Sequence, residues 1–217
     1  MLDIFSLNHG RLSLVARGGN SAKSPLKAQL QPFQPLLIDW QGRADLKTLT
    51  QVEPRHGPQL ASTEALYCGF YINELVQRLL PPQEVHQPLF ACYIETLNTL
   101  AASRDFEPVL RRFEQAFADA VGYGFAWDQA NDLGQLVAAD GHYYYDPEQG
   151  ILAEPAPGAR LQGLPGSVLL ALAADDLSSP TSRRLAKRVM RVLIDHLLQG
   201  RPLHSRNLFT HWRGDES

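Results

Sequence analysis

The sequence has little cysteine, and this scarcity excludes two kinds of site. Only Cys68 and Cys92 occur among 217 residues, and they do not form a CxxC pair. Two separated cysteines cannot build a disulfide framework or a thiolate zinc site. Both lie within helical patterns, so we expect reduced core residues.

Long apolar runs are also missing. No stretch approaches the roughly 18 consecutive apolar residues of a membrane span. The N-terminal sequence MLDIFSLNHG has neither the basic start nor the apolar run of a signal peptide. We therefore expect a cytoplasmic protein that buries an ordinary hydrophobic core.

Catalytic signatures are absent too. The chain has no GxxxxGK[ST] loop, no GxGxxG after a strand, no HExxH and no GxSxG elbow. His204 and His211 could share a helical face, but no carboxylate or cysteine lies at ligand spacing, so surface or capping roles are favoured over a metal site. We expect no catalytic residue, no metal and no cofactor, while a triad assembled only in three dimensions stays open.

Charge is present but unevenly distributed. Residues 1–60 carry seven Lys/Arg against four Asp/Glu, residues 61–182 carry five against sixteen, and residues 183–206 carry seven against one. Two basic zones around an acidic body suit a local polyanion site, because local cation density sets affinity for phosphates. The alternative is ordinary solvated faces on a mildly acidic protein.

The pattern along the chain changes near residue 57. Before it, strands are predicted at 11–16, 35–40 and 46–52, separated by turn residues. After it, helices are predicted at 63–80, 89–102, 108–121, 165–174 and 180–199, with a hairpin over 143–152. The first helix is expected to place Leu66, Phe70, Asn73 and Val76 or Leu80 along one stripe. The sequence thus predicts an α+β fold with domains at 1–57 and 58–217 and an insertion at about 123–164.

Two basic segments are the candidate binding features. The first has its cations on a strand and a Gly/Ser-rich loop, an arrangement typical of a small barrel that tracks a phosphate backbone. Its members are Arg11, Arg17, Lys23, Lys27, Arg43 and Lys47. Phe33 and Trp40 could stack on bases, although Trp40 also suits a core or turn position.

The helix at 180–199 is the second. One arc is apolar, and the opposite arc carries Arg184, Lys187, Arg188 and Arg191, almost unopposed by acid. Such a face suits an acidic partner or DNA rather than simple solvation.

Five ordered blocks resemble the RecO family of bacterial recombination mediators. They are HGRLSLVARGG, SPLKAQLQPFQPLL, LYCGFYINELVQRLL, LRRFE with the later VGYG, and LQGRPLHSRNLF. The resemblance covers nearly the whole chain. It implies an N-terminal oligonucleotide-binding (OB) β-barrel followed by a mainly helical domain.

The resemblance also implies a function in DNA repair and recombination. Family members bind single- and double-stranded DNA, anneal complementary strands, engage the acidic tail of single-stranded-DNA-binding protein, and work with RecR to load RecA. The basic strand and loop would then be the DNA surface. The tail ends in phenylalanine, so an apolar pocket edged by cations is expected, with Arg111, Arg112, Arg188 and Arg206 as candidates.

The sequence departs from the family in two places. Many members carry two CxxC pairs after VGYG, whereas residues 122–155 contain no cysteine. We therefore expect apolar packing of the 143–152 hairpin in place of zinc. Members also usually have a further strand before the position of Met1, so either the start is internal or the barrel lacks its first strand and has an open edge.

Two other functions are kept as alternatives. A pure protein-interaction scaffold would not shift labelled single-stranded DNA by itself. An unrecognised hydrolase would need a polar cleft joining a nucleophile to a histidine.

Overall fold

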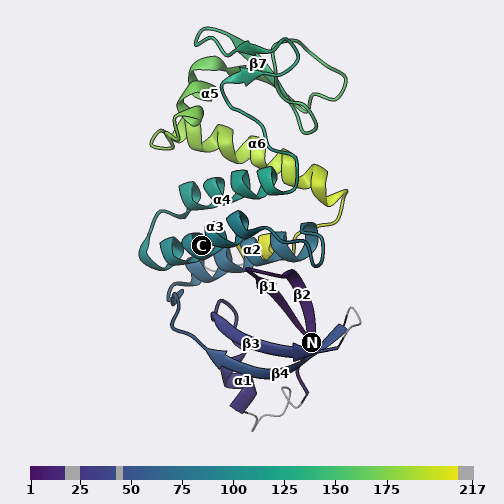
Figure 1. Cartoon of the computed structure of the whole chain (residues 1–217). Coiled ribbons are helices and arrows are strands. Elements are labelled where there is room, and N and C mark those ends of the chain that lie inside the picture. The colour runs from purple at the N-terminus through teal and green to yellow at the C-terminus, as the bar shows by residue number, and fades with distance from the viewer. Residues whose placement is uncertain (18–24, 43–45, 210–217) are drawn as a thin grey trace. The chain divides into compact units, whose positions relative to one another are not determined.

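The computed structural model describes residues 1–17, 25–42 and 46–209. Its elements confirm the α+β fold, with strands first, helices after them, and small sheets in the second half (Figure 1). The chain packs as two compact units: unit 1 is Met1–Phe106 with Leu203–Ser217, and unit 2 is Glu107–Pro202. The strand-to-helix change near residue 57 therefore falls inside unit 1.

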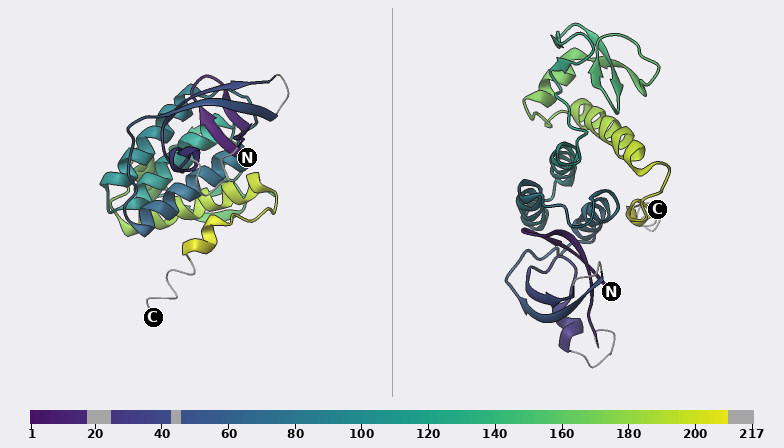
Figure 2. Two further views of the ribbon diagram at one scale, coloured as in Figure 1. Left: turned by 90° about the horizontal axis from the view of Figure 1, so that it is seen from below. Right: turned by 45° about the vertical axis from the view of Figure 1, so that its right-hand side comes forward.

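Unit 1 begins with a curved four-stranded sheet (Figure 2). Its strands are β1 (Leu2–Ser6), β2 (Gly10–Val15), β3 (Leu36–Gln41) and β4 (Leu46–Pro54), in the order β1-β2-β4-β3. β2 and β4 are parallel, and the other two pairs are antiparallel. Within the described residues β1 and β3 are unpaired edges, so the sheet is open rather than a closed barrel.

Strand β1 was not apparent in the sequence pattern. It pairs with β2 along its whole length, from Leu2 opposite Leu14 to Ser6 opposite Gly10. A strand therefore does precede residues 11–16. The short helix α1 (Pro25–Gln29) between β2 and β3 was also not predicted.

Helices α2 (Thr63–Leu79) and α3 (Gln87–Ala102) complete most of unit 1. Ser62 caps α2 by accepting a hydrogen bond from the amide of Ala65. Phe5 of β1 meets Phe90 and Tyr93 of α3, with ring centroids 5.3 and 5.6 Å away. One face of the sheet is thus packed on helices.

The stripe predicted for α2 is correct at Val76 and Leu80, which are buried, and wrong at its other positions. Phe70 is 38% exposed, and Leu66 and Asn73 are half-buried. Besides Val76, the buried positions of α2 are Ala65, Cys68, Gly69, Tyr71, Ile72 and Leu75. Apolar residues occupy most of the circumference of this helix, so periodicity alone could not select the face that packs.

Glu74 of α2 holds the returning end of the chain on unit 1. Its carboxylate accepts hydrogen bonds from the amides of His204 and Ser205 and from Ser205 Oγ, at 2.9, 2.8 and 2.6 Å. It also pairs with Arg78 at 2.8 Å. Burial alone would raise the pKa of Glu74, but the Ser205 and His204 hydrogen bonds and Arg78 outweigh it and lower the pKa.

Unit 2 places a small β-rich insertion on two helices. Helix α4 (Phe106–Ala120) leads into β5 (Gln129–Ala130), β6 (Gln135–Leu136), β7 (His142–Asp146), β8 (Gly150–Leu152) and β9 (Leu161–Pro165), and helices α5 (Gly166–Ala173) and α6 (Pro180–Leu198) follow. The predicted hairpin is confirmed as β7 with β8, and β9 joins its other side.

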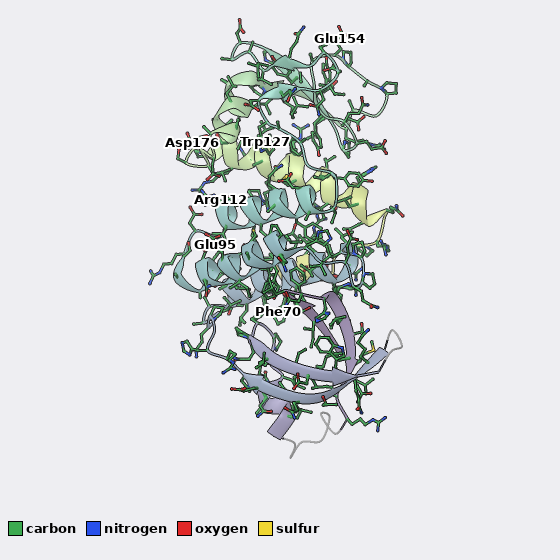
Figure 3. The ribbon with its side chains drawn as sticks, in the orientation of Figure 1. Phe70, Glu95, Arg112, Trp127, Glu154 and Asp176 are labelled. Atoms are coloured by element: carbon green, nitrogen blue, oxygen red, sulfur yellow. The ribbon has the colours of Figure 1, made fainter. Side chains whose placement is uncertain are left out.

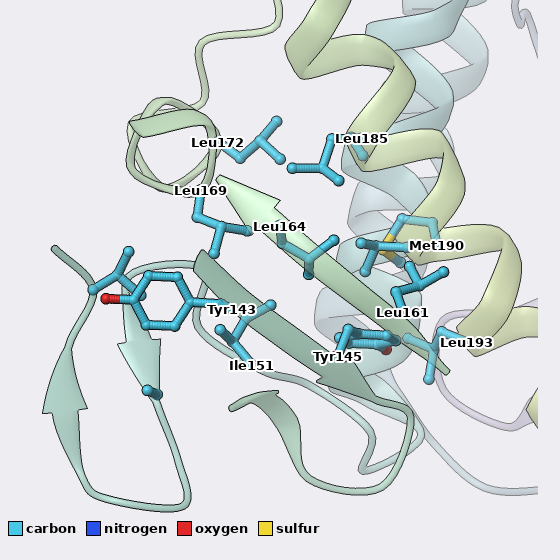
Figure 4. Close-up of a cluster of buried hydrophobic side chains, with 14 of the residues drawn as sticks. Tyr143, Tyr145, Ile151, Leu161, Leu164, Leu169, Leu172, Leu185, Met190 and Leu193 are labelled. Atoms are coloured by element: carbon cyan, nitrogen blue, oxygen red, sulfur yellow. The ribbon is translucent and has the colours of Figure 1, made fainter. Parts of the chain in front are cut away.

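The core of unit 2 joins this sheet to α5 and α6 (Figure 4). Tyr145, Ile151, Leu169, Val189 and Leu193 are fully buried within it. The ring of Phe125 lies 4.8 Å from that of Trp127 and 5.1 Å from that of Tyr145. Apolar and aromatic packing therefore holds the insertion in the described structure.

No helix within the described ranges is both long enough and apolar enough to span a membrane.

Candidate nucleic-acid interface

Three of the predicted DNA-binding residues gather around β4. Arg17 is exposed just beyond the end of β2, Lys27 is exposed on α1, which packs on β4, and Lys47 lies on β4 itself. β2 and β4 run parallel with Val15 opposite Thr48, so Arg17 lies about level with Thr50. Lys47 comes three residues before Thr50, which offsets it from Arg17 by roughly 10 Å along the strand direction. Lys47 pairs with Leu14 and shares its face of the sheet.

Arg11 lies at the other end of β2. Its Nε donates a 3.0 Å hydrogen bond to the carbonyl of Leu80, and its own carbonyl accepts from the amide of Gln83. The guanidinium therefore satisfies a carbonyl at the C-terminal end of α2. Arg11 is better placed to join the sheet to α2 than to contact a ligand. Lys23 and Arg43 lie outside the described residues.

The two candidate stacking aromatics occupy different environments. The Phe33 ring packs against Phe70, 5.2 Å away, and closes over Gly69, where a Cβ would come within 2.8 Å of its Cζ. Phe33 is thus committed to packing on α2. Trp40 is half-buried on β3, with its ring edge-on to His9 at 4.9 Å.

The predicted basic face of α6 is exposed. Arg184, Lys187, Arg188 and Arg191 all reach solvent, while Leu185, Val189 and Leu193 are buried on the opposite side. At 1.5 Å per residue, Arg184, Arg188 and Arg191 form a row about 10 Å long. The helix is capped by Ser179, whose Oγ accepts from the amide of Ser182.

The cations of this face differ in how far they are neutralised. Lys187 Nζ lies 2.9 Å from Glu107, and the hydrogen bond it donates is the main reason that the pKa of Glu107 is lowered. Arg191 is 3.9 Å from Asp195. Among the described residues Arg184 bonds only to Thr181, and Arg188 has no hydrogen bond or ion pair. Arg188 is therefore available to an anion without breaking an existing contact.

The arginines of LRRFE point in different directions. Arg111 forms a 2.7 Å ion pair with Glu114, and their side chains are only 12% and 2% exposed. It is better suited to stabilising α4 than to binding a partner. Arg112 is exposed, and its Nε donates a bifurcated hydrogen bond to the two carboxylate oxygens of Asp175, at 3.0 and 2.9 Å, on the side of unit 2 where Figure 3 labels Arg112 and Asp176. Arg206 is half-buried in the turn at 205–209 of unit 1.

The candidate binding residues on the sheet and on α6 provide charge rather than reactive groups. In the part of the chain that the structure describes, no group of three or more His, Cys, Asp or Glu residues could hold a metal ion. His204 is exposed, and its amide bonds to Glu74 as part of the turn, whereas His211 falls outside the described residues. The chemistry that the site provides is the attraction of phosphates or carboxylates by exposed guanidinium and ammonium groups.

Sequence reasoning missed one exposed feature of unit 2. The β5–β6 hairpin presents Leu133 and Leu136 to solvent, 49% and 78% exposed. The only signal in the sequence was the turn Asn131-Asp132-Leu133-Gly134, whose Gly134 has a φ of 61°.

Comparisons with known proteins cover nearly the entire chain. The model of the family described as "Recombination protein O N terminal" matches residues 1–58, and that described as "Recombination protein O C terminal" matches residues 60–207. A protein named DNA repair protein RecO from Marinobacter nauticus is 61% identical over 214 residues, which cover 97% of this chain and 87% of that protein.

More distant relatives carry the same name. DNA repair protein RecO from Cellvibrio japonicus is 41% identical over 212 residues, covering 97% of this chain and 89% of the relative. The protein of that name from Azoarcus sp. is 40% identical over 211 residues, covering 96% and 87%.

Proposed function

The chain belongs to the RecO family of DNA repair proteins, and on that premise we propose that it is a recombination mediator that catalyses no reaction of its own. It binds single- and double-stranded DNA and anneals complementary strands. Together with RecR it helps RecA load onto DNA coated by single-stranded-DNA-binding protein.

The observation that carries the DNA-binding proposal is the exposure of Arg17 and Lys27 beside β2 and β4, with the half-buried Lys47 on β4 as a further candidate. Arg17 is exposed just past the end of β2, and Lys27 is exposed on α1, which packs on β4; the sheet is open, so a nucleic acid strand finds a wide approach. Lys23 and Arg43 lie outside the described residues, and we predict that they belong to the same site. Exposed cations attract the phosphate backbone of any sequence, which suits a protein that must act on any damaged DNA.

The experiment measures binding of labelled single-stranded DNA between about 50 and 200 mM salt. We expect Arg17→Glu with Lys23→Glu to weaken binding and to lower the dependence of log K on log salt by about 0.7 for each lost phosphate contact. Arg55→Glu is the matched control, because Arg55 is exposed in the same unit but already pairs with Glu53 at 2.8 Å. Unchanged binding of the double variant at low salt would remove the site from this end of the sheet.

We assign the acidic partner to the exposed arginines outside the sheet. The tail of single-stranded-DNA-binding protein would meet Arg188, with Arg112 as a further candidate, because both side chains are exposed. Arg206 is half-buried and Arg111 is in a buried pair, so these two are less suited to the tail. A synthetic acidic peptide ending in phenylalanine tests this. Arg188→Glu should weaken its binding about tenfold, and the exposed Arg160→Glu in the insertion should not.

The same measurements separate the mediator from a pure scaffold. If the chain binds the acidic peptide but does not shift single-stranded DNA at low salt, the scaffold function replaces the mediator function.

A further inference from the structure

The β5–β6 hairpin of unit 2, residues 129–136, is held rigidly although it lies at the surface. The amide of Asn131 donates to Ile151, and its side chain donates to the carbonyl of Gln149. The carboxylate of Asp132 accepts from the amides of Ala153 and Glu154 at about 3 Å. The hairpin is therefore fixed to the end of β8 before any partner arrives.

This fixed hairpin exposes apolar side chains. Leu136 is 78% exposed and Leu133 is 49% exposed, and they are the two large apolar residues of unit 2 with the greatest exposure among those described. Burying a leucine side chain lowers the free energy of the folded state, so hydrogen bonds that fix the hairpin with its leucines in water do not help folding. Their exposure is the property of a contact surface.

The surroundings of the hairpin are acidic. Residues 122–165 contain six Asp/Glu and one Arg. Asp132, which precedes Leu133 in the turn, is exposed, and so is Glu154, whose amide bonds to Asp132 and which Figure 3 labels in unit 2. Backbone hydrogen bonds outweigh burial and lower the pKa of Asp132, so its carboxylate is charged at neutral pH. This surface repels nucleic acid and favours a partner with exposed cations.

The chain carries a matching surface on α6. Arg184 and Arg188 are exposed there and lack an acidic partner among the described residues. Arginine stems cover apolar side chains while their guanidinium groups reach carboxylates, so a row of arginines can receive both Leu136 and Glu154. Within one copy the two surfaces cannot meet, because the sheet β7–β9 lies between the hairpin and α6 (Figure 4).

We propose that the β5–β6 hairpin docks on the basic face of α6 of a second copy of this chain. The contact is heterologous: each copy uses its hairpin on one neighbour and its α6 on another, which gives dimers and then short open arrays. Acidic ligands of α6 compete with this contact. The inference goes beyond the proposed function and does not depend on DNA binding by unit 1.

Sedimentation velocity of the full chain, without DNA, tests the proposal. At about 0.1 M salt the wild type is expected to associate with rising concentration, and at about 0.5 M salt the association should weaken as the charges are screened. Leu136→Asp and Arg188→Glu should each raise the concentration at half-association at least about tenfold. Val85→Asp and Arg104→Glu are matched controls, because both residues are exposed in unit 1.

Mixing the two variants gives the sharper result. The Arg188→Glu chain keeps an intact hairpin and the Leu136→Asp chain keeps an intact α6, so an equimolar mixture should form a one-to-one dimer that neither variant forms alone. Association of both variants like the wild type, no dimer in the mixture, or a wild type that stays monomeric across this range would each overturn the proposal.

Discussion

Replacing Glu74 by alanine should release the end of the chain from α2. The loss can be estimated from the three groups that its carboxylate accepts. The Ser205 amide and hydroxyl belong to a residue that is only 5% exposed, so leaving them without a partner costs about 1 to 3 kcal/mol. The His204 amide belongs to an exposed residue and can bond to water instead. We expect a total of about 1 to 3 kcal/mol.

The same carboxylate makes this contact sensitive to pH. The folded protein holds the pKa of Glu74 below its ordinary value of 4.5. Because the pKa of Glu74 is lower in the folded than in the unfolded protein, its carboxylate contributes its full stabilisation above the unfolded-state pKa. This stabilisation is lost as pH falls through the folded-state pKa. Docking of residues 203–209 should therefore weaken below about pH 4.5 in the wild type and should show less of this dependence in Glu74→Ala.

Hydrogen exchange measured residue by residue is the suitable assay. The amides of His204 and Ser205 should exchange about 10- to 100-fold faster in Glu74→Ala, and amides of unit 2 should change little. Glu64→Ala in the first turn of the same helix is the control, because no contact of that carboxylate holds residues 203–209. Unchanged protection at 204–205 would show that Leu203 and Phe209 hold the segment without Glu74.

Three further predictions concern single positions. Gly10→Ala should lower the free energy of unfolding, measured by denaturant titration, by more than about 2 kcal/mol. Gly10 has a φ of 63°, and an added Cβ would lie 1.9 Å from the carbonyl oxygen of Glu84. Gly134→Ala is the control: Gly134 has a φ of 61° but open space around it, so this change should cost only about 1 kcal/mol. Tyr145→Phe should keep or raise stability by about 1 kcal/mol in urea unfolding, because the buried hydroxyl has no hydrogen-bond partner among the described residues; a clear loss would reveal one. Ser179→Ala should lower the melting temperature through the loss of about 1 kcal/mol of capping at α6, and calorimetry would show no change if Pro180 alone sets the helix start.

The local chemistry of the chain was enough to predict most of its elements. Alternation identified β2 and β3, and the Ser179-Pro180 start and Gly200 stop bounded α6 closely. The basic arc of α6 could be predicted because a helix with buried Leu185 and Val189 must expose Arg184 and Arg188. Strand β1 was missed because Leu2–Ser6 is stabilised by pairing with β2, which a single segment does not reveal.

The sequence by itself determined the class of fold, the two basic zones, and a resemblance that the family comparisons confirm. Only the tertiary structure decided which charges are accessible. Arg111 and Arg112 are adjacent and chemically identical, yet one is 12% exposed beside Glu114 and the other is 54% exposed beside Asp175. Arg11, predicted to face a ligand, instead bonds to the end of α2. Asp175 and Leu80 are distant in the sequence from the arginines that bind them, so only packing brings these pairs together. Glu114 is three residues from Arg111 on the same helix, and there packing decides only that the pair is buried.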